Sequence, residues 1–137
     1  MTGLWVCLAV LAAAGAGGAV WRRRSGRVRV RGRDEGKRLG AAELGEALGE
    51  RATLVQFSSA FCAPCRATRR VLGEVAGMVP GVTHVEIDAE DHLDLVRALG
   101  ILKTPTVLVL DADGRVVRRA TGQPRRADVI AALGEAV

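Results

Sequence analysis

The sequence has no tyrosine, only two phenylalanines and two tryptophans, and only three cysteines among its 137 residues. With aromatic residues at 3%, leucine, valine and alanine must fill the core of any folded domain, and a hydrophobic fraction of 49% supplies enough of them. Three cysteines are too few for the disulfide framework of a small secreted domain. The length suits one compact domain with room for an additional segment.

Acidic residues are absent from positions 3–33, whereas seven arginines lie within residues 22–33. Residues 34–137 hold 13 Lys and Arg against 15 Asp and Glu. The net charge of +5 therefore comes from one short segment. The rest of the chain lacks the excess of positive charge that is typical of a nucleic-acid-binding domain, so we expect no nucleic-acid partner.

An uncharged run extends from Gly3 to Trp21. About 20 apolar residues in a helix cross the hydrocarbon core of a bilayer, and Trp5 and Trp21 are placed where the two interfaces would lie. A cleaved signal peptide is the alternative. However, no Lys or Arg precedes the run, and the charged cluster follows it instead. We predict a retained transmembrane anchor over residues 1–21, which contacts the membrane through residues 3–21.

The arginine cluster also predicts an orientation. Positive residues close to the end of a span stay on the cytoplasmic side. We therefore expect a single-pass cell-membrane protein whose following domain faces the cytoplasm. Residues 22–36 are predicted to be an Arg-rich juxtamembrane linker, in which the alternation at 27–31 is compatible with a short edge strand.

Residues 37–137 alternate between helix and strand patterns. Strands are predicted at 53–57, 82–88, 107–110 and 115–120, and helices at 41–49, 66–76 and 90–99 and at the C-terminus. Strands joined by a helix are parallel, and the Asp111–Gly114 hairpin joins antiparallel strands. The expected fold class is α/β, with a mixed sheet of four or five strands between layers of helices.

Two cysteines, Cys62 and Cys65, lie where a predicted strand ends and the next predicted helix begins. A helix N-terminus carries partial positive charge and free N–H groups, which favour a thiolate. Pro64 suits the first helical turn because it lacks an N–H group and has a fixed φ. Cys65 is within reach of Cys62 for a disulfide, and such a pair near a βαβ pattern is typical of a dithiol redox site.

Half of a zinc site is the alternative interpretation of this pair. A structural zinc ion needs four ligands, and the sequence has no second Cys-x-x-Cys. The other candidate ligands are Cys7, His84 and His92. We favour the redox site and expect neither a metal nor another cofactor.

From Leu39 to Val137 the sequence resembles the thioredoxin family. The resemblance is carried by Cys62-Ala63-Pro64-Cys65, by Thr104-Pro105-Thr106 about 40 residues further on, and by the Asp113-Gly114 hairpin followed by Gly122. It implies a thioredoxin-like three-layer fold over residues 37–137 and thiol–disulfide exchange with protein disulfides. It also implies that Pro105 is cis and faces the active-site disulfide, and that the backbone at Thr104 pairs with a substrate peptide.

The resemblance assigns two sets of site residues. The catalytic residues are expected to be Cys62 and Cys65, and the substrate-binding residues are expected to be Phe61, Ala63, Pro64, Thr104, Pro105 and Gly122. The sequence departs from the family at several of its positions. Phe61 replaces the usual Trp, Ala63 replaces Gly, Gln56 replaces a buried Asp, and His84 replaces a Lys.

The proposed chemistry has two steps, in which the Cys62 thiolate attacks a substrate disulfide and Cys65 resolves the mixed disulfide. We therefore expect a membrane-tethered protein-disulfide reductase that acts in cell redox homeostasis. A reducing partner would return its disulfide to the dithiol. Gln56 cannot accept a proton at neutral pH, which leaves a binding or scaffold module with little turnover as an alternative. If the domain lay on the extracytoplasmic side of the membrane, a role as a reductant in cytochrome c assembly would be a further alternative.

Overall fold

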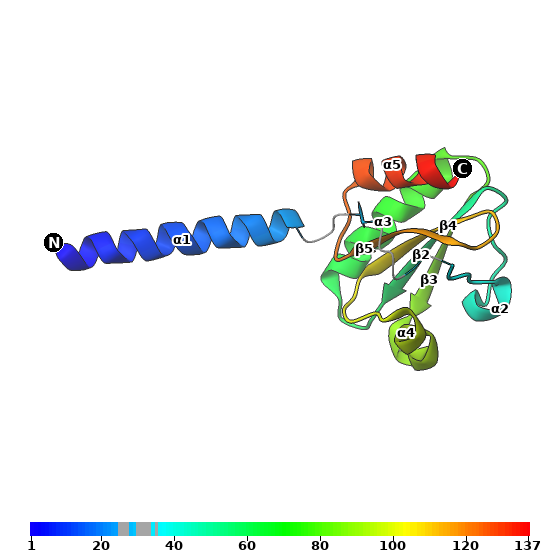
Figure 1. Ribbon diagram of the computed structural model, residues 1–137, viewed down its shortest axis with the longest axis horizontal. Coiled ribbons are helices and arrows are strands. Elements are labelled where there is room, and N and C mark those ends of the chain that lie inside the picture. Colours follow the sequence, from blue (N-terminus) through cyan, green and yellow to red (C-terminus); the bar gives the residue numbers. More distant parts are fainter. Residues whose placement is uncertain (25–27, 30–33, 35) are drawn as a thin grey trace.

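The computed structural model describes residues 1–24, 28–29, 34 and 36–137. Helix α1 (Thr2–Arg24) stands away from an α/β domain, and none of its residues is buried (Figure 1). It continues three residues beyond the predicted end of the span at Trp21. With a mean hydropathy of 1.9, α1 is long and apolar enough to cross a membrane, and an N-terminal signal sequence would meet the same criterion.

The domain is built on a five-stranded sheet in the order β1-β5-β4-β2-β3. The strands are β1 (Val28–Arg29), β2 (Ala52–Ser58), β3 (Val82–Asp88), β4 (Thr106–Asp111) and β5 (Val116–Thr121). Strands β2 and β3 are parallel because a helix joins them, and every other pairing is antiparallel. The predicted mixed sheet is confirmed.

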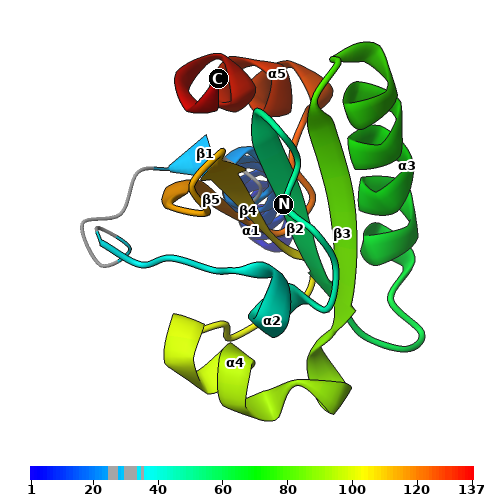
Figure 2. The same cartoon turned by 90° about the vertical axis from the view of Figure 1, so that its right-hand side faces the viewer.

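Helices cover both faces of the sheet, as the expected three-layer fold requires (Figure 2). On one face α3 (Ala63–Met78) and α5 (Arg126–Ala136) pack through Leu72, Val75 and Leu133 against Leu54 of β2. On the other face lie the short helices α2 (Ala41–Leu44), η2 (Ala89–Asp91) and α4 (Leu93–Leu99). A second core on this face includes Leu44, Val55, Phe57 and Leu99. Along β2 the side chains of the two cores alternate, since Leu54 belongs to the first core and Val55 to the second.

Three helices differ from their predicted lengths. The helix predicted at 41–49 ends at Leu44, because Gly45 adopts φ 74°, a left-handed conformation that ends helices. The helix predicted at 66–76 begins at Ala63, since Pro64 fits its first turn. The helix predicted at 90–99 is divided, because His92 adopts a non-helical conformation between η2 and α4.

Part of the segment predicted as a linker contacts the domain. Val28 and Arg29 pair with Ala120 and Arg119 of β5. The buried Asp34 accepts hydrogen bonds from Nε and Nη2 of buried Arg119, at 2.8 and 2.7 Å. The remaining positions of the predicted linker, 25–27, 30–33 and 35, lie outside the described residues. The division of the chain at residues 21 and 36 stays a prediction.

Candidate active site

Cys62 and Cys65 form a disulfide at the N-terminus of α3, with their Cα atoms 5.2 Å apart. Strand β2 ends at Ser58, and a short loop leads to Cys62, which is the N-cap of α3. The backbone N–H of Cys65 donates to Cys62 Sγ at 3.2 Å. A thiolate at Cys62 would therefore receive both a hydrogen bond and the favourable field of the helix N-terminus.

The two sulfur-bearing residues differ in exposure. Cys65 is 1% exposed, whereas Cys62 is half-buried and open on one side. Thiol–disulfide exchange requires that the attacking sulfur reach the target sulfur. Cys62 is accessible for attack on a substrate, and Cys65 is positioned to attack only Cys62.

The Thr104–Pro105 peptide bond is cis, and the loop that contains it lies beside the disulfide. Thr104 Oγ1 is 3.9 Å from Cys62 Sγ and 2.8 Å from Ser59 Oγ. The backbone N–H of Gly122, whose φ is 91°, donates to the carbonyl of Pro105 at 2.8 Å. The structure thus brings Thr104, Pro105 and Gly122 together next to Cys62, although they lie 42 or more positions away in the sequence.

The remaining predicted binding residues form an exposed rim. Phe61 is fully exposed, and Ala63 and Pro64 are also exposed. Phe61 has φ 57°, the one positive φ among the described residues other than glycine. A bulky side chain rarely adopts this conformation, which clusters at functional sites. The loop therefore presents an apolar ring to solvent immediately before the attacking cysteine.

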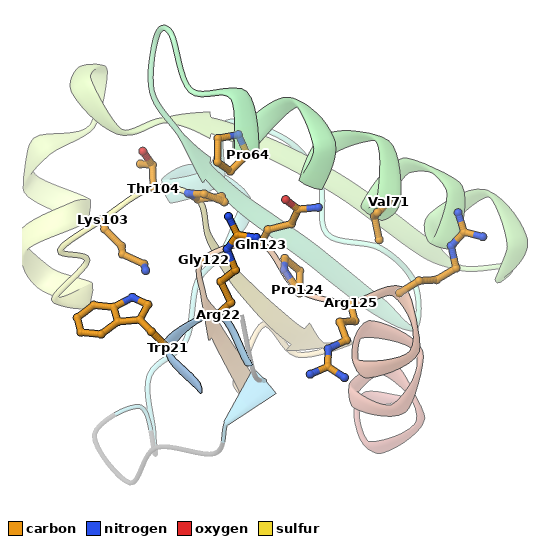
Figure 3. A pocket seen from close by; sticks show the side chains of 12 residues that line it. Trp21, Arg22, Pro64, Val71, Lys103, Thr104, Gly122, Gln123, Pro124 and Arg125 are labelled. Carbon is orange, nitrogen blue, oxygen red and sulfur yellow. The ribbon is translucent and has the colours of Figure 1, made fainter. Parts of the chain in front are cut away.

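A groove of about 710 Å³ lies beside the loop of Pro105 (Figure 3). Thr104, which lines it, has its Oγ1 3.9 Å from Cys62 Sγ. Four of the predicted binding residues line it, namely Pro64, Thr104, Pro105 and Gly122. The other lining residues, which sequence reasoning missed, are Trp21, Arg22, Val71, Lys103, Gln123, Pro124, Arg125 and Arg126. Proximity in the sequence to Thr104 and Gly122 was the available signal for Lys103 and for residues 123–126. Trp21, Arg22 and Val71 come from other segments.

Gln56 is completely buried behind Cys65. Its Nε2 donates to the carbonyl of Cys65 at 2.8 Å and to Ser58 Oγ at 2.9 Å. Because a carbonyl only accepts hydrogen bonds, the amide nitrogen must face it, and Oε1 then faces His84 Nε2 at 3.1 Å. His84 therefore carries a hydrogen on Nε2 and donates it to Gln56.

This arrangement bears on the proton of the Cys65 thiol. Neither the Gln56 amide nor the donating Nε2 of His84 can take up that proton. A base other than these two groups, such as a water molecule, must accept it when Cys65 attacks.

Burial lowers the pKa of His84 below its ordinary value of 6.5, outweighing the opposing effect of Glu86, while Arg69 adds to the lowering. The pKa of Glu86 is itself lowered, chiefly by the hydrogen bonds it accepts from Arg69, one of them at 2.6 Å. At neutral pH the imidazole of His84 is therefore neutral.

This pKa shift predicts a pH dependence of stability. The unfolded chain binds a proton at His84 below about pH 6.5, whereas the folded chain resists it, so the free energy of unfolding falls as the pH falls below that value. One proton changes it by at most about 1.4 kcal/mol per pH unit. Urea unfolding between pH 7.5 and pH 5, in steps, is expected to show a shallower loss in a His84→Asn variant. Equal slopes in the two proteins would contradict the assignment.

Among the residues that the structure describes, no group of three or more His, Cys, Asp and Glu is arranged to hold a metal ion. Within that part of the chain, Cys7, His84 and His92 do not complete a ligand set with the cysteine pair. The geometry supports dithiol chemistry at Cys62 and Cys65.

Comparisons with known proteins agree with this geometry. A family model described as thioredoxin matches residues 40–135. The thioredoxin of Alicyclobacillus acidocaldarius is 34% identical over 79 residues, which cover 56% of this chain and 74% of that protein. The chloroplastic thioredoxin M3 of Oryza sativa is 27% identical over 61% of this chain, and the match spans about half, 48%, of that protein.

The solved structures show the same fold. A mutant thioredoxin from Halobacterium salinarum superposes with a TM-score of 0.58 at 21% identity, over 64% of this chain and 75% of that one. The similarity covers the α/β domain that carries the cysteine pair.

Proposed function

Since this chain belongs to the thioredoxin family, we propose that it is a membrane-tethered protein-disulfide reductase that works through the Cys62-Ala63-Pro64-Cys65 dithiol. Thiol–disulfide oxidoreductase chemistry follows from the family and its cysteine pair. The observation that carries the proposal is the accessible Cys62 at the start of α3, backed by the buried Cys65 and flanked by Thr104. The expected role is in cell redox homeostasis.

The reaction begins with the reduced dithiol. The Cys62 thiolate attacks one sulfur of the substrate disulfide, the substrate S–S bond breaks, and the released thiolate takes a proton from water. Cys65 then loses its proton and attacks Cys62 Sγ. The mixed disulfide breaks, the second substrate thiol leaves, and the Cys62–Cys65 disulfide forms. The substrate gains two electrons and the protein loses two, so a reducing partner must restore the dithiol.

The substrate is expected to bind as an extended chain across the rim of the site. Thr104 and Pro105 would pair with its backbone, and Gly122 would support the Pro105 carbonyl through its hydrogen bond. Phe61, Ala63 and Pro64 would contact its side chains, because all three are exposed next to Cys62.

The proposed membrane tether is α1, which is apolar and exposed along its length. Its last turn carries three arginines, Arg22, Arg23 and Arg24. The positive-inside rule favours a domain on the cytoplasmic face of the cell membrane. Protease treatment of intact spheroplasts tests this orientation, and we expect the domain to be protected. Digestion from outside would instead favour an extracytoplasmic reductant, as in cytochrome c assembly. Release of the domain by alkaline extraction would favour a cleaved signal sequence.

A binding or scaffold module with little turnover is the second candidate function. It is favoured by Gln56, since the side chain that contacts the backbone of Cys65 is an amide, which cannot accept a proton at neutral pH. Such a module would bind protein disulfides without reducing them repeatedly.

One experiment separates the two functions. The full-length protein, reduced beforehand and freed of reductant, is mixed with insulin in non-ionic detergent, and the thiols formed on insulin are counted. A reductase is expected to generate thiols stoichiometrically, and repeatedly when dithiothreitol is supplied. Failure to generate insulin thiols under either condition would refute the reductase.

A further inference from the structure

The groove beside the disulfide carries positive charge, and we propose that it selects substrates in which an acidic polypeptide segment adjoins the target disulfide. The inference rests on the proposed reductase function and adds a substrate class to it. It depends on four observations: the sign of the charges, their availability, their distance from Cys62 and their contrast with the opposite side of the site.

The charges that line the groove are of one sign. Its cationic residues are Arg22, Lys103, Arg125 and Arg126, and no Asp or Glu is among the described residues that line it. They come from the end of α1, the loop before Pro105 and the start of α5, and Lys103 and Arg125 lie on either side of Gly122 in Figure 3. Prolines supply much of the apolar surface between them, which suits an extended chain rather than a compact anion.

Two cations of the domain, Lys103 and Arg125, are available to a partner, and Arg22 at the end of α1 adds a third exposed charge. Arg126 forms an ion pair with Glu74, so its charge is already compensated. Within the described part of the chain, the ion pairs do not include Lys103 or Arg125, and both residues are exposed. Carboxylates of a bound polypeptide can therefore approach both side chains.

Lys103 also lies close to the reacting sulfur along the chain. It directly precedes Thr104, whose Oγ1 is 3.9 Å from Cys62 Sγ. Arg125 is the N-cap residue of α5 and follows Gly122, which is hydrogen-bonded to Pro105. The two cations thus flank the segment that is expected to receive the substrate backbone.

The opposite side of the active-site loop has a different charge. A recess of about 400 Å³ there is lined by Ser58, Ser59 and Ala60 and by three charged residues, Arg69, Glu86 and Asp88. Arg69 is paired with Glu86, which leaves the carboxylate of Asp88. An acidic segment is therefore favoured on the groove side and disfavoured on the other.

Each exposed ion pair contributes little, and two together correspond to about a 3–10-fold gain in kcat/KM at low salt. The gain must shrink as salt is added, because the screening length falls to about 3 Å at 1 M.

The test uses disulfide peptides with one common cysteine-containing core and with acidic, neutral or basic flanks. Pre-reduced full-length protein in non-ionic detergent is expected to reduce the acidic peptide fastest and the basic peptide slowest, and about 1 M salt is expected to remove the difference.

Charge reversal locates the effect. The Lys103→Glu/Arg125→Glu variant is expected to reverse the order of the acidic and basic peptides. The matched control, Arg51→Glu/Arg115→Glu, changes the net charge equally at exposed positions at the opposite end of the sheet and is expected to keep the order. Lys103→Gln/Arg125→Gln, which adds no repulsion and leaves Arg22 in place, is expected to remove most of the preference.

The outcomes separate this inference from the proposed function. Equal rates for the three peptides, or a preference for the basic peptide, would overturn the acidic-substrate inference and leave the reductase intact. An equal response in the control variant would also overturn it, since the preference would then follow net charge. If no peptide is reduced, the reductase itself is refuted.

Discussion

Replacing Cys62 with serine is expected to lower the turnover of protein disulfides by at least about 10³-fold, because the hydroxyl is not a nucleophile toward sulfur at neutral pH. Replacing Cys65 with serine is expected to stop turnover at a different point. Cys62 would still attack, and the mixed disulfide with the substrate would accumulate because nothing resolves it. The difference follows from burial, since Cys65 is 1% exposed and cannot reach a substrate in place of Cys62.

Insulin reduction measures the loss of turnover, and non-reducing electrophoresis detects the mixed disulfide. The Cys7→Ser variant is the matched control, because this cysteine is exposed on α1, away from the disulfide. It is expected to turn over at the unmodified rate. Activity retained without Cys62, or a substrate adduct that forms on Cys65, would show that the two roles have been assigned wrongly.

Replacing Asp34 with alanine is expected to lower the free energy of unfolding by about 3–5 kcal/mol. The guanidinium of Arg119 is 4% exposed and is held by both carboxylate oxygens of Asp34 and by the carbonyl of Leu99. Without Asp34, the described residues would offer this buried positive charge one neutral partner, the carbonyl of Leu99. Removing both charges with an Asp34→Leu/Arg119→Met variant is expected to recover much of the loss, since an apolar replacement for a buried ion pair costs little.

Pulse proteolysis of the full-length protein in urea measures this loss. Proteolysis is preferred to tryptophan fluorescence because both tryptophans, Trp5 and Trp21, lie on α1 and neither lies in the core of the domain. Glu50→Ala removes an exposed carboxylate as the control and is expected to change stability by less than about 0.5 kcal/mol. A loss below about 1 kcal/mol in Asp34→Ala would mean that water compensates the positive charge of Arg119.

The Asp34–Arg119 pair also shows what sequence reasoning could not reach. The two residues are 85 positions apart, and neither periodicity nor a motif links them. The segment 22–36 is rich in arginine and glycine, so its composition predicted a linker. The alternation at 27–31 is compatible with the short strand β1 that pairs with β5, whereas the ion pair of Asp34 with Arg119 depends on tertiary structure alone.

Local patterns predicted the strands better than the inward faces of the helices. Continuous or alternating apolar runs located β2, β3, β4 and β5 to within a few residues. Apolar residues at helical spacing favour core positions for Met78, Leu93 and Ile130 as well, yet these side chains are 57%, 53% and 45% exposed. Met78 and Leu93 are terminal residues of their helices, where fewer neighbours cover a side chain. In α5 the small Ala132 is buried instead.

The part of the site that could be predicted consists of residues that are close together in the sequence. The junction at Cys62 follows from a strand, a cysteine pair and a proline in sequence. The cationic groove was not predictable, because Lys103 and Arg125 come together only when the loop before β4 meets the start of α5. The contact between Gln56 and His84 likewise required the parallel pairing of β2 with β3.

The pairing of β1 with β5 limits how far the redox site can travel. Val28 pairs with Ala120, two residues before Gly122, and only three residues separate it from Arg24 at the end of α1. Four Cα–Cα steps span at most about 15 Å. The reactive end of the domain therefore stays close to the end of α1. In a chain anchored through α1, as proposed, the redox site can react only with disulfides that lie near the membrane surface.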